Sequence, residues 1–182
     1  MTTQLATERL RIRPLQAADV PAFVAYRRIP DVARFQDWDE SYDEQRANAL
    51  VESQVGRFIP PSGESVQLGV RDAITDELLG DVAIHTLGDQ PDSYELGFTL
   101  APVSQGAGFA TEAVIRVLEY LFRECGAHRV SATCDSRNRA STRLLERVGL
   151  RQEARHHSAD WFKGEWTSVD VFALLADEFA ER

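Results

Sequence analysis

The sequence lacks several features that would place it in particular classes of protein. None of its apolar runs approaches the roughly 20 residues that a helix needs to cross a bilayer. Its first residues, MTTQLATERLRIRP, contain no apolar core of the kind found in signal peptides, so we expect an intracellular, cytoplasmic protein without a membrane partner. Only two cysteines occur, Cys125 and Cys134, and they form no CxxC motif. We therefore expect two small buried thiols and no metal site.

Positively charged residues are also few. The chain has 29 acidic and 20 basic side chains, and Lys163 is the only lysine. The net charge of -9 argues against non-specific binding of nucleic acid and is compatible with a cationic partner. A hydrophobic content of 43% is ordinary for a soluble globular protein, and the length fits one domain, residues 1–182.

What the sequence does contain is a series of strand and helix patterns. A period of two predicts strands within 9–15, 65–73, 78–87, 93–101 and 129–135, and a last strand with a helical tail within 166–179. A period of 3.6 predicts helices within 19–27, 41–58, 109–126 and 138–149. Short polar links between the middle strands indicate antiparallel neighbours. Strands before, between and after the helices indicate an α+β fold, one mixed sheet with helices on its faces.

Two helix positions carry specific expectations. Asp19 precedes Pro21 and is expected to cap the first helix. In the second helix, Val55 is expected to share an apolar face with Ala47 and Val51.

The stretch SQGAGFATEA, at 104–113, places two glycines directly before a helical pattern. It is not a P-loop, because no Gly-Lys pair occurs in the sequence. It is not a dinucleotide fingerprint, because Thr111 stands where that motif needs a third glycine. A glycine turn at a helix start can direct several backbone N–H groups at one anion. A plain strand-to-helix turn fits this stretch equally well.

The wider sequence narrows these alternatives. QGAGFA, at 105–110, fits Q/R-x-x-G-x-G/A, the acetyl-coenzyme A signature of the GNAT N-acetyltransferase superfamily. The continuation ATEAV, the opening ATERLRIRPL, the segment NRASTRLLERVGLR at 138–151 and the closing KGEWTSVDVFALL resemble the RimJ/RimL-like branch, in its order. The resemblance implies a GNAT fold, with a mixed, mostly antiparallel sheet of about six to seven strands flanked by helices on both faces.

The resemblance also implies which residues bind acetyl-coenzyme A. In the family, backbone amides of the glycine loop hold the pyrophosphate, a role that carries over to Gln105, Gly106, Ala107, Gly108, Phe109 and Ala110. The strand edge at Phe98, Thr99 and Leu100 would pair with the pantetheine amides like an added strand. Asn138 matches an asparagine that bonds the pantetheine arm, and a helix N-cap is its alternative role.

The implied reaction is acetyl transfer from a thioester to a neutral primary amine. Ser141 is expected to bind the donor near its thiol and to give a proton to the leaving thiolate, and the alternative is a serine bonded back to its own helix. Glu95 is the expected base through water, and the alternative is a strand-surface glutamate. His156 and His157 offer another base or belong to an exposed hairpin. The tyrosine acid frequent in the family has no match, because no tyrosine follows Tyr120.

The prediction of an acceptor-binding site rests on the segment RFQDWDESYDE, at 34–44. Phe35, Trp38 and Asp39 are expected to form an acidic, aromatic wall for a cationic amine, and the alternative is a solvated acidic loop. The acceptor is either a protein N-terminal amine or a small-molecule amine such as a polyamine, an amino acid or an antibiotic. A coenzyme A-binding sensor without catalysis is the other alternative. The resemblance is compatible with a homodimer formed through the final strand.

Overall fold

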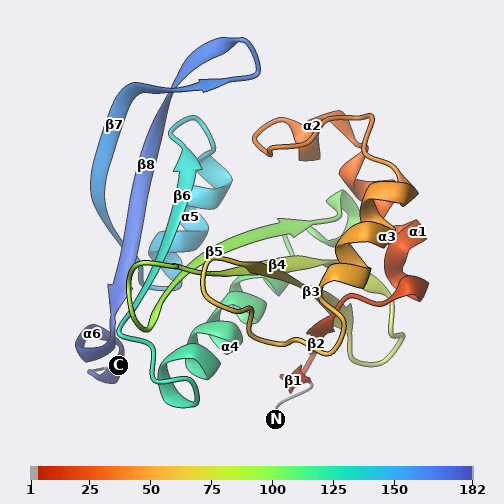
Figure 1. Cartoon of the computed structure of the whole chain (residues 1–182), viewed down its shortest axis with the longest axis horizontal. Coiled ribbons are helices and arrows are strands. Elements are labelled where there is room, and N and C mark those ends of the chain that lie inside the picture. Colours follow the sequence, from red (N-terminus) through yellow and green to blue (C-terminus); the bar gives the residue numbers. More distant parts are fainter. Residues whose placement is uncertain (1–3, 182) are drawn as a thin grey trace.

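The computed structural model describes residues 4–181 and is built around one sheet of eight strands in the order β1-β2-β3-β4-β5-β6-β8-β7 (Figure 1). The strands are β1 (Leu5–Ala6), β2 (Leu10–Pro14), β3 (Ser65–Asp72), β4 (Leu78–Thr86), β5 (Ser93–Leu100), β6 (Arg129–Asp135), β7 (Arg151–Phe162) and β8 (Glu165–Leu175). All neighbours are antiparallel except β5 and β6, which are parallel.

The expected mixed, mostly antiparallel sheet is confirmed, with eight strands in place of six to seven. The difference comes from the two ends of the sheet. Strand β1 has only two residues, too few to show a period. Strand β7 is exposed along nearly its whole length, so its sequence carries no apolar alternation.

Helices cover both faces of the sheet (Figure 1). They are α1 (Val20–Arg27), α2 (Pro30–Ala33), α3 (Glu44–Ser53), α4 (Phe109–Arg123), α5 (Arg139–Arg147) and α6 (Ala176–Ala180), with short 3-10 turns at Ala17–Asp19 and Pro102–Ser104. Helices α1 and α3 enclose one hydrophobic cluster, and α4 and α5 belong to the other. No helix within residues 4–181 is long and apolar enough to cross a membrane.

Helix α4 is held by the apolar stripe that its sequence predicts. Ala113, Val114, Val117, Leu118 and Leu121 are all almost fully buried against the sheet. Full burial of each valine or leucine side chain contributes about 1.5–3 kcal/mol. This stripe anchors the helix whose N-terminus follows the glycine loop.

Two local expectations are corrected. Asp19 precedes α1, but its side chain forms no hydrogen bond that caps the helix. The buried carboxylate instead accepts hydrogen bonds from the Gln16 N–H, from Arg13 and from Arg71. Val55 is 75% exposed because α3 ends at Ser53, before its predicted face reaches that residue.

Strands β5 and β6 diverge beside the glycine loop. Their pairing covers only 93–95 of β5, whereas β5 stays paired with β4 to Leu100. The Ala101 N–H donates to the Leu79 carbonyl of β4. Because backbone groups alternate in direction along a strand, those of Phe98 and Leu100 point away from β4. The end of β5 therefore presents an open backbone edge.

Candidate active site

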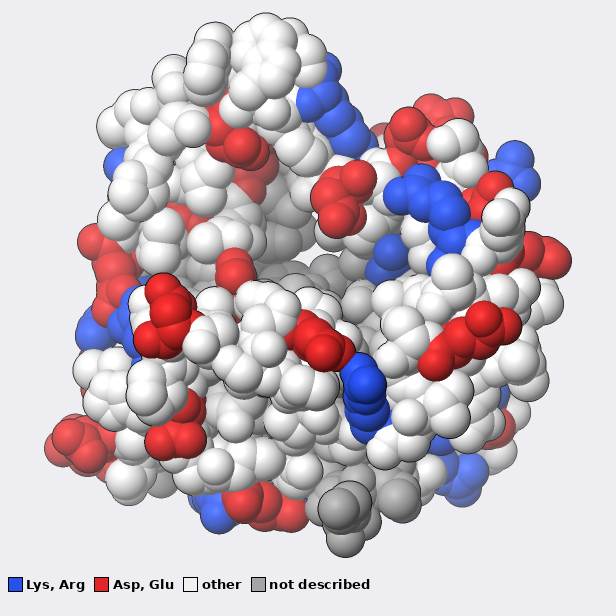
Figure 2. Space-filling model, in the orientation of Figure 1, with Lys and Arg blue, Asp and Glu red and all other residues white. Residues whose placement is uncertain are grey.

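A cavity of about 600 Å³ lies beside this open edge, a size typical of small-molecule sites. It is enclosed by β5, the glycine loop, the first turns of α4 and α5, and the segment around α2. Its lining includes Phe98, Thr99, Leu100, Gln105, Gly106, Gly108, Phe109, Ala110, Asn138 and Ser141. In space-filling view, the face toward the viewer is hollowed between the β7–β8 hairpin and the α1–α3 side (Figure 2). The structure thus brings together nearly all residues predicted to bind the acetyl donor.

The glycine loop has the geometry of an anion cradle. Gly106 and Gly108 have φ values of 80° and 83°, a region that residues with a Cβ rarely adopt. Gly108 precedes α4 and provides no side-chain cap, so the first N–H groups of the helix remain available to a ligand. The helix dipole adds positive potential at the same point. This geometry can stabilise a negative group such as a phosphate.

Asn138 has the N-cap role that its sequence position suggests, and it also faces the cavity. It precedes α5, and its Oδ1 accepts a hydrogen bond from the Ser141 N–H at 3.1 Å. The side chain also lines the cavity. Since the cap uses only the oxygen, the amide nitrogen keeps its two donors for a ligand.

Ser141 lies in the first turn of α5 and also lines the cavity. Within the described chain its hydroxyl forms no hydrogen bond, so the back-bonded alternative is not observed. A hydroxyl in this state can donate to a group in the cavity.

Two arginines of α5, Arg143 and Arg147, extend the positive rim of the cavity. Arg147 also donates to the Thr111 hydroxyl of α4 at 3.4 Å. Neither arginine was predicted as a site residue. Their spacing of four residues places them on one face of the helix. Only the tertiary structure shows that this face is turned toward the cavity.

Glu95 lies where β5 and β6 part. It is the last β5 residue paired with β6, and its Oε1 accepts a hydrogen bond from the Thr133 hydroxyl of β6 at 2.9 Å. It shares a sheet face with Thr99, which lines the cavity, but it does not line the cavity itself. A proton path between Glu95 and the cavity therefore needs an intervening water.

The cysteines and histidines lie away from this chemistry. Partial burial raises the pKa of both Cys125 and Cys134, so these thiols stay protonated and weakly nucleophilic at neutral pH. His156 and His157 are exposed on β7, outside the cavity lining. Both histidines therefore belong to an exposed hairpin, which is one of the two alternatives that the sequence offers for them.

The three residues expected to bind the acceptor are separated. Phe35 lines the cavity. Trp38 is buried, with its Nε1 donating to the Arg27 carbonyl at 3.1 Å and its ring 3.7 Å from the Arg27 guanidinium. Asp39 is exposed, and hydrogen bonds from the Ser41 hydroxyl and N–H lower the pKa of its carboxyl. The structure thus assigns Trp38 to the core and Asp39 to a turn, and leaves only Phe35 on the cavity.

The β7–β8 hairpin contributes contacts that the sequence did not reveal. The Lys163 ammonium at its tip donates to the carbonyls of Ala33 at 2.6 Å and Trp38 at 2.7 Å. At the base of α5, Arg137 donates to Glu165 of β8 at 2.8 Å. The two Lys163 hydrogen bonds therefore join the hairpin to the α2 segment, which lies opposite the hairpin tip in Figure 1.

An open strand edge beside a glycine-built anion site can accommodate an extended, phosphate-bearing molecule. Residues 9–151 match the family described as acetyltransferase (GNAT) domain. The chain therefore belongs to the GNAT acetyltransferase family.

Similar proteins agree with this assignment. The uncharacterized N-acetyltransferase YnaD of Bacillus subtilis (strain 168) is 29% identical over 175 residues, covering 96% of this chain and 98% of YnaD. The crystal structure of a GNAT-family acetyltransferase from Bacillus anthracis has a TM-score of 0.85 at 26% identity, covering 96% and 99% of the two chains. Spermidine N-acetyltransferase from Vibrio cholerae, solved with CoA and spermine, has a TM-score of 0.82 at 19% identity, over 96% and 99%. At that identity the last likeness shows the fold alone.

Proposed function

We propose that this GNAT enzyme uses acetyl-coenzyme A to acetylate a primary amine, in the manner of the RimJ/RimL-like branch. The observation that supports the donor is the cavity, which joins an open strand edge to a glycine anion cradle. A protein of the same fold has been solved with CoA, which supports the same ligand class. The two free thiols are compatible with a reducing compartment, and we propose a cytoplasmic location.

The cavity residues fit the parts of this donor. The N–H groups that follow Gly106 and Gly108 would hold the pyrophosphate, with Arg143 and Arg147 supplying further positive charge. The open backbone groups of Phe98 and Leu100 would pair with the pantetheine amides, although Gln105 already donates to the Leu100 carbonyl at 3.1 Å. The amide nitrogen of Asn138 would donate to the same arm.

In this proposal the chain binds both substrates and moves two protons. The bound donor supplies an acetyl thioester. Glu95 accepts the amine proton through a water, because only a neutral amine can attack. As the amine nitrogen bonds to the acetyl carbon and the bond from that carbon to sulfur breaks, Ser141 donates its hydroxyl proton to the sulfur and regains a proton from solvent water. The protonated cysteines agree with direct attack in a ternary complex, without an acyl-enzyme.

The acceptor is proposed as a cationic primary amine that enters the hollow between the hairpin and the α2 segment. Asp31 and Phe35 line this side of the cavity and provide a carboxylate and an aromatic ring. The net charge of -9 attracts a cation from a distance. A protein N-terminal amine is the acceptor class that the RimJ/RimL resemblance favours, and a small polyamine, amino acid or antibiotic amine is the alternative.

Turnover of acetyl-CoA tests the proposed function. Thiol release should rise on addition of at least one acceptor from a panel of N-terminal peptides, polyamines, amino acids and aminoglycosides. Isothermal titration with CoA, run in parallel, measures donor binding without an acceptor. Binding of CoA without turnover on any acceptor would favour the sensor alternative, and failure to bind CoA would contradict the proposal.

Paired variants of α5 should separate donor binding from chemistry. Ser141→Ala should lower kcat by about 10- to 100-fold with unchanged CoA affinity, since a thiolate leaves readily and needs only modest help from an acid. Asn138→Ser keeps a capping oxygen but loses the amide donors, so it should weaken CoA binding about tenfold. Steady-state kinetics and CoA titration measure both. Wild-type kcat in Ser141→Ala would remove the hydroxyl from the mechanism.

A further inference from the structure

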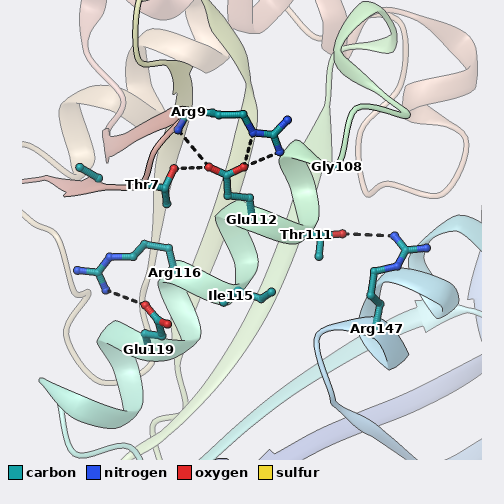
Figure 3. Close-up of a pocket in the computed structure, with 10 residues that line it drawn as sticks. Thr7, Arg9, Gly108, Thr111, Glu112, Ile115, Arg116, Glu119 and Arg147 are labelled. Atoms are coloured by element: carbon teal, nitrogen blue, oxygen red, sulfur yellow. Dashed lines mark hydrogen bonds and ion pairs between the residues drawn. The ribbon is translucent and has the colours of Figure 1, made fainter. Parts of the chain in front are cut away.

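A second hollow, of about 660 Å³, lies along the outer side of α4, next to β1 and β2 (Figure 3). Thr7, Arg9 and Glu112 line this hollow and do not line the acetyl-donor cavity. Gly108 lines both. The two hollows adjoin, and Arg9 reaches the glycine loop from the second of them.

Glu112 receives hydrogen bonds from both Thr7 and Arg9. Its Oε1 accepts from the Thr7 hydroxyl at 2.5 Å, and its Oε2 accepts from Arg9 Nε at 2.7 Å and forms an ion pair with Arg9 Nη2 at 2.5 Å (Figure 3). Partial burial opposes ionisation of Glu112, but these hydrogen bonds outweigh it and lower the pKa of its carboxyl. Glu112 is therefore an anion at neutral pH.

Arg9 also contacts the loop itself. Its Nη1 donates to the Ala107 carbonyl at 3.0 Å, and its guanidinium lies 4.7 Å from the centre of the Phe109 ring. In a planar trans peptide, the carbonyl of one residue and the N–H of the next point in opposite directions. Because Arg9 holds the Ala107 carbonyl on its own side, the Gly108 N–H is directed away from Arg9. A carbonyl that rotated into the cradle would instead repel an anion.

The charge of Glu112 gives the pair a second effect. A carboxylate in the first turn stabilises α4 through the helix dipole. The same carboxylate repels any anion bound at that helix N-terminus. The Arg9 ion pair offsets this repulsion, so the helix gains its acidic residue without losing its anion site.

We propose that Thr7, Arg9 and Glu112 form a clamp that holds the glycine loop in its anion-binding conformation and so positions the phosphate end of the acetyl donor. The clamp rests on the proposed use of acetyl-CoA. It also accounts for two motifs together: Thr7 and Arg9 belong to ATERLRIRPL, and Glu112 belongs to ATEAV. Arg9 and Glu112 are 103 residues apart in the sequence, and the two motifs meet at the Glu112 carboxylate.

The test compares two acetyl donors on the full chain. Arg9→Ala should weaken CoA binding, and raise KM for acetyl-CoA, by about tenfold, with kcat within about twofold of wild type. Arg9→Lys keeps the positive charge but loses the planar guanidinium. Glu112→Gln loses the negative charge but keeps the shape of the side chain. Each of these two variants should weaken CoA binding about threefold. S-acetylpantetheine lacks the pyrophosphate. With this donor all variants should have the wild-type kcat/KM.

Glu119→Gln is the matched control. It removes an ion-pair carboxylate of the same helix and hollow, 3.8 Å from Arg116, that does not contact the loop. CoA affinity in this variant should equal that of wild type. Wild-type CoA affinity in Arg9→Ala, or an equal loss with S-acetylpantetheine, would overturn the clamp while leaving the proposed function intact. Failure of the wild-type chain to bind CoA would instead contradict the proposed function. If Arg9→Ala does not fold, Arg9→Lys and Glu112→Gln decide between the same outcomes.

Discussion

Replacing Glu95 with glutamine should lower kcat by about 10²- to 10⁴-fold, the range typical of a lost general base. The amide has the shape of the carboxylate and can still accept the hydrogen bond from Thr133, but it cannot take a proton from the amine. The pH dependence of kcat should flatten, because proton transfer to Glu95 no longer contributes. Thiol release measured across a pH series, with a fixed acceptor, checks both results.

Two comparisons make the Glu95 result specific. CoA affinity of Glu95→Gln should equal that of wild type, since the side chain lies outside the donor cavity. Thr133→Val removes the hydroxyl that orients Glu95 and should lower kcat by only about tenfold or less. A wild-type kcat with an unchanged pH profile would make Glu95 a strand-surface glutamate, and the base would have to be sought elsewhere.

Replacing Asp81 with alanine should destabilise the fold by about 3–5 kcal/mol, the cost of leaving a buried charge without its partner. Asp81 is 1% exposed, and its carboxylate accepts hydrogen bonds from the Tyr26 hydroxyl and the Gln67 amide. Arg27 Nη2 lies 3.5 Å from the same carboxylate. Burial is the main reason that the pKa of Tyr26 is raised well above its ordinary value, and the negative charge of Asp81 raises it further. The Tyr26 hydroxyl therefore stays protonated and remains a donor.

The Arg27 guanidinium has little else to stabilise its charge. It is 5% exposed, lies 4.0 Å from the centre of the Phe23 ring and 3.7 Å from that of Trp38, and its Nε has no hydrogen-bond partner within the described residues. Without Asp81 the guanidinium would keep aromatic neighbours, including Tyr42, but no carboxylate partner among the described residues. Urea unfolding measures the loss, and the melting temperature should fall by about 2–4 °C per kcal/mol.

Glu64→Gln is the matched control for Asp81→Ala. The Arg57–Glu64 ion pair has a similar chemistry at 2.6 Å, but its side chains are 44% and 51% exposed, and its loss should cost less than about 1 kcal/mol. Replacing both members of the buried pair, with Arg27→Met and Asp81→Leu, should restore much of the stability lost in Asp81→Ala. A loss of under about 1 kcal/mol in Asp81→Ala would show that the buried charge has another source of compensation.

Most elements of the fold could be predicted because their patterns are local. The apolar stripe of α4 and the alternation in β3 to β6 each lie within one short segment, where the period of the backbone decides which side chains can be buried. The glycine loop is equally local, since its φ values of 80° and 83° require residues without a Cβ. The elements missed or misjudged were β1, too short for a period, β7, exposed on both faces, and the last turn predicted for α3.

The sequence by itself therefore determined the order of the elements, the glycine cradle and the family resemblance. Only the tertiary structure showed that β5 and β6 part after Glu95, that Trp38 packs on Arg27 instead of facing the cavity, and that Lys163 joins the hairpin to the α2 segment. The physical reason is the distance along the chain. Lys163 and Ala33 are 130 residues apart, and no backbone period relates such pairs; they meet because the packing of the sheet and its helices places them together.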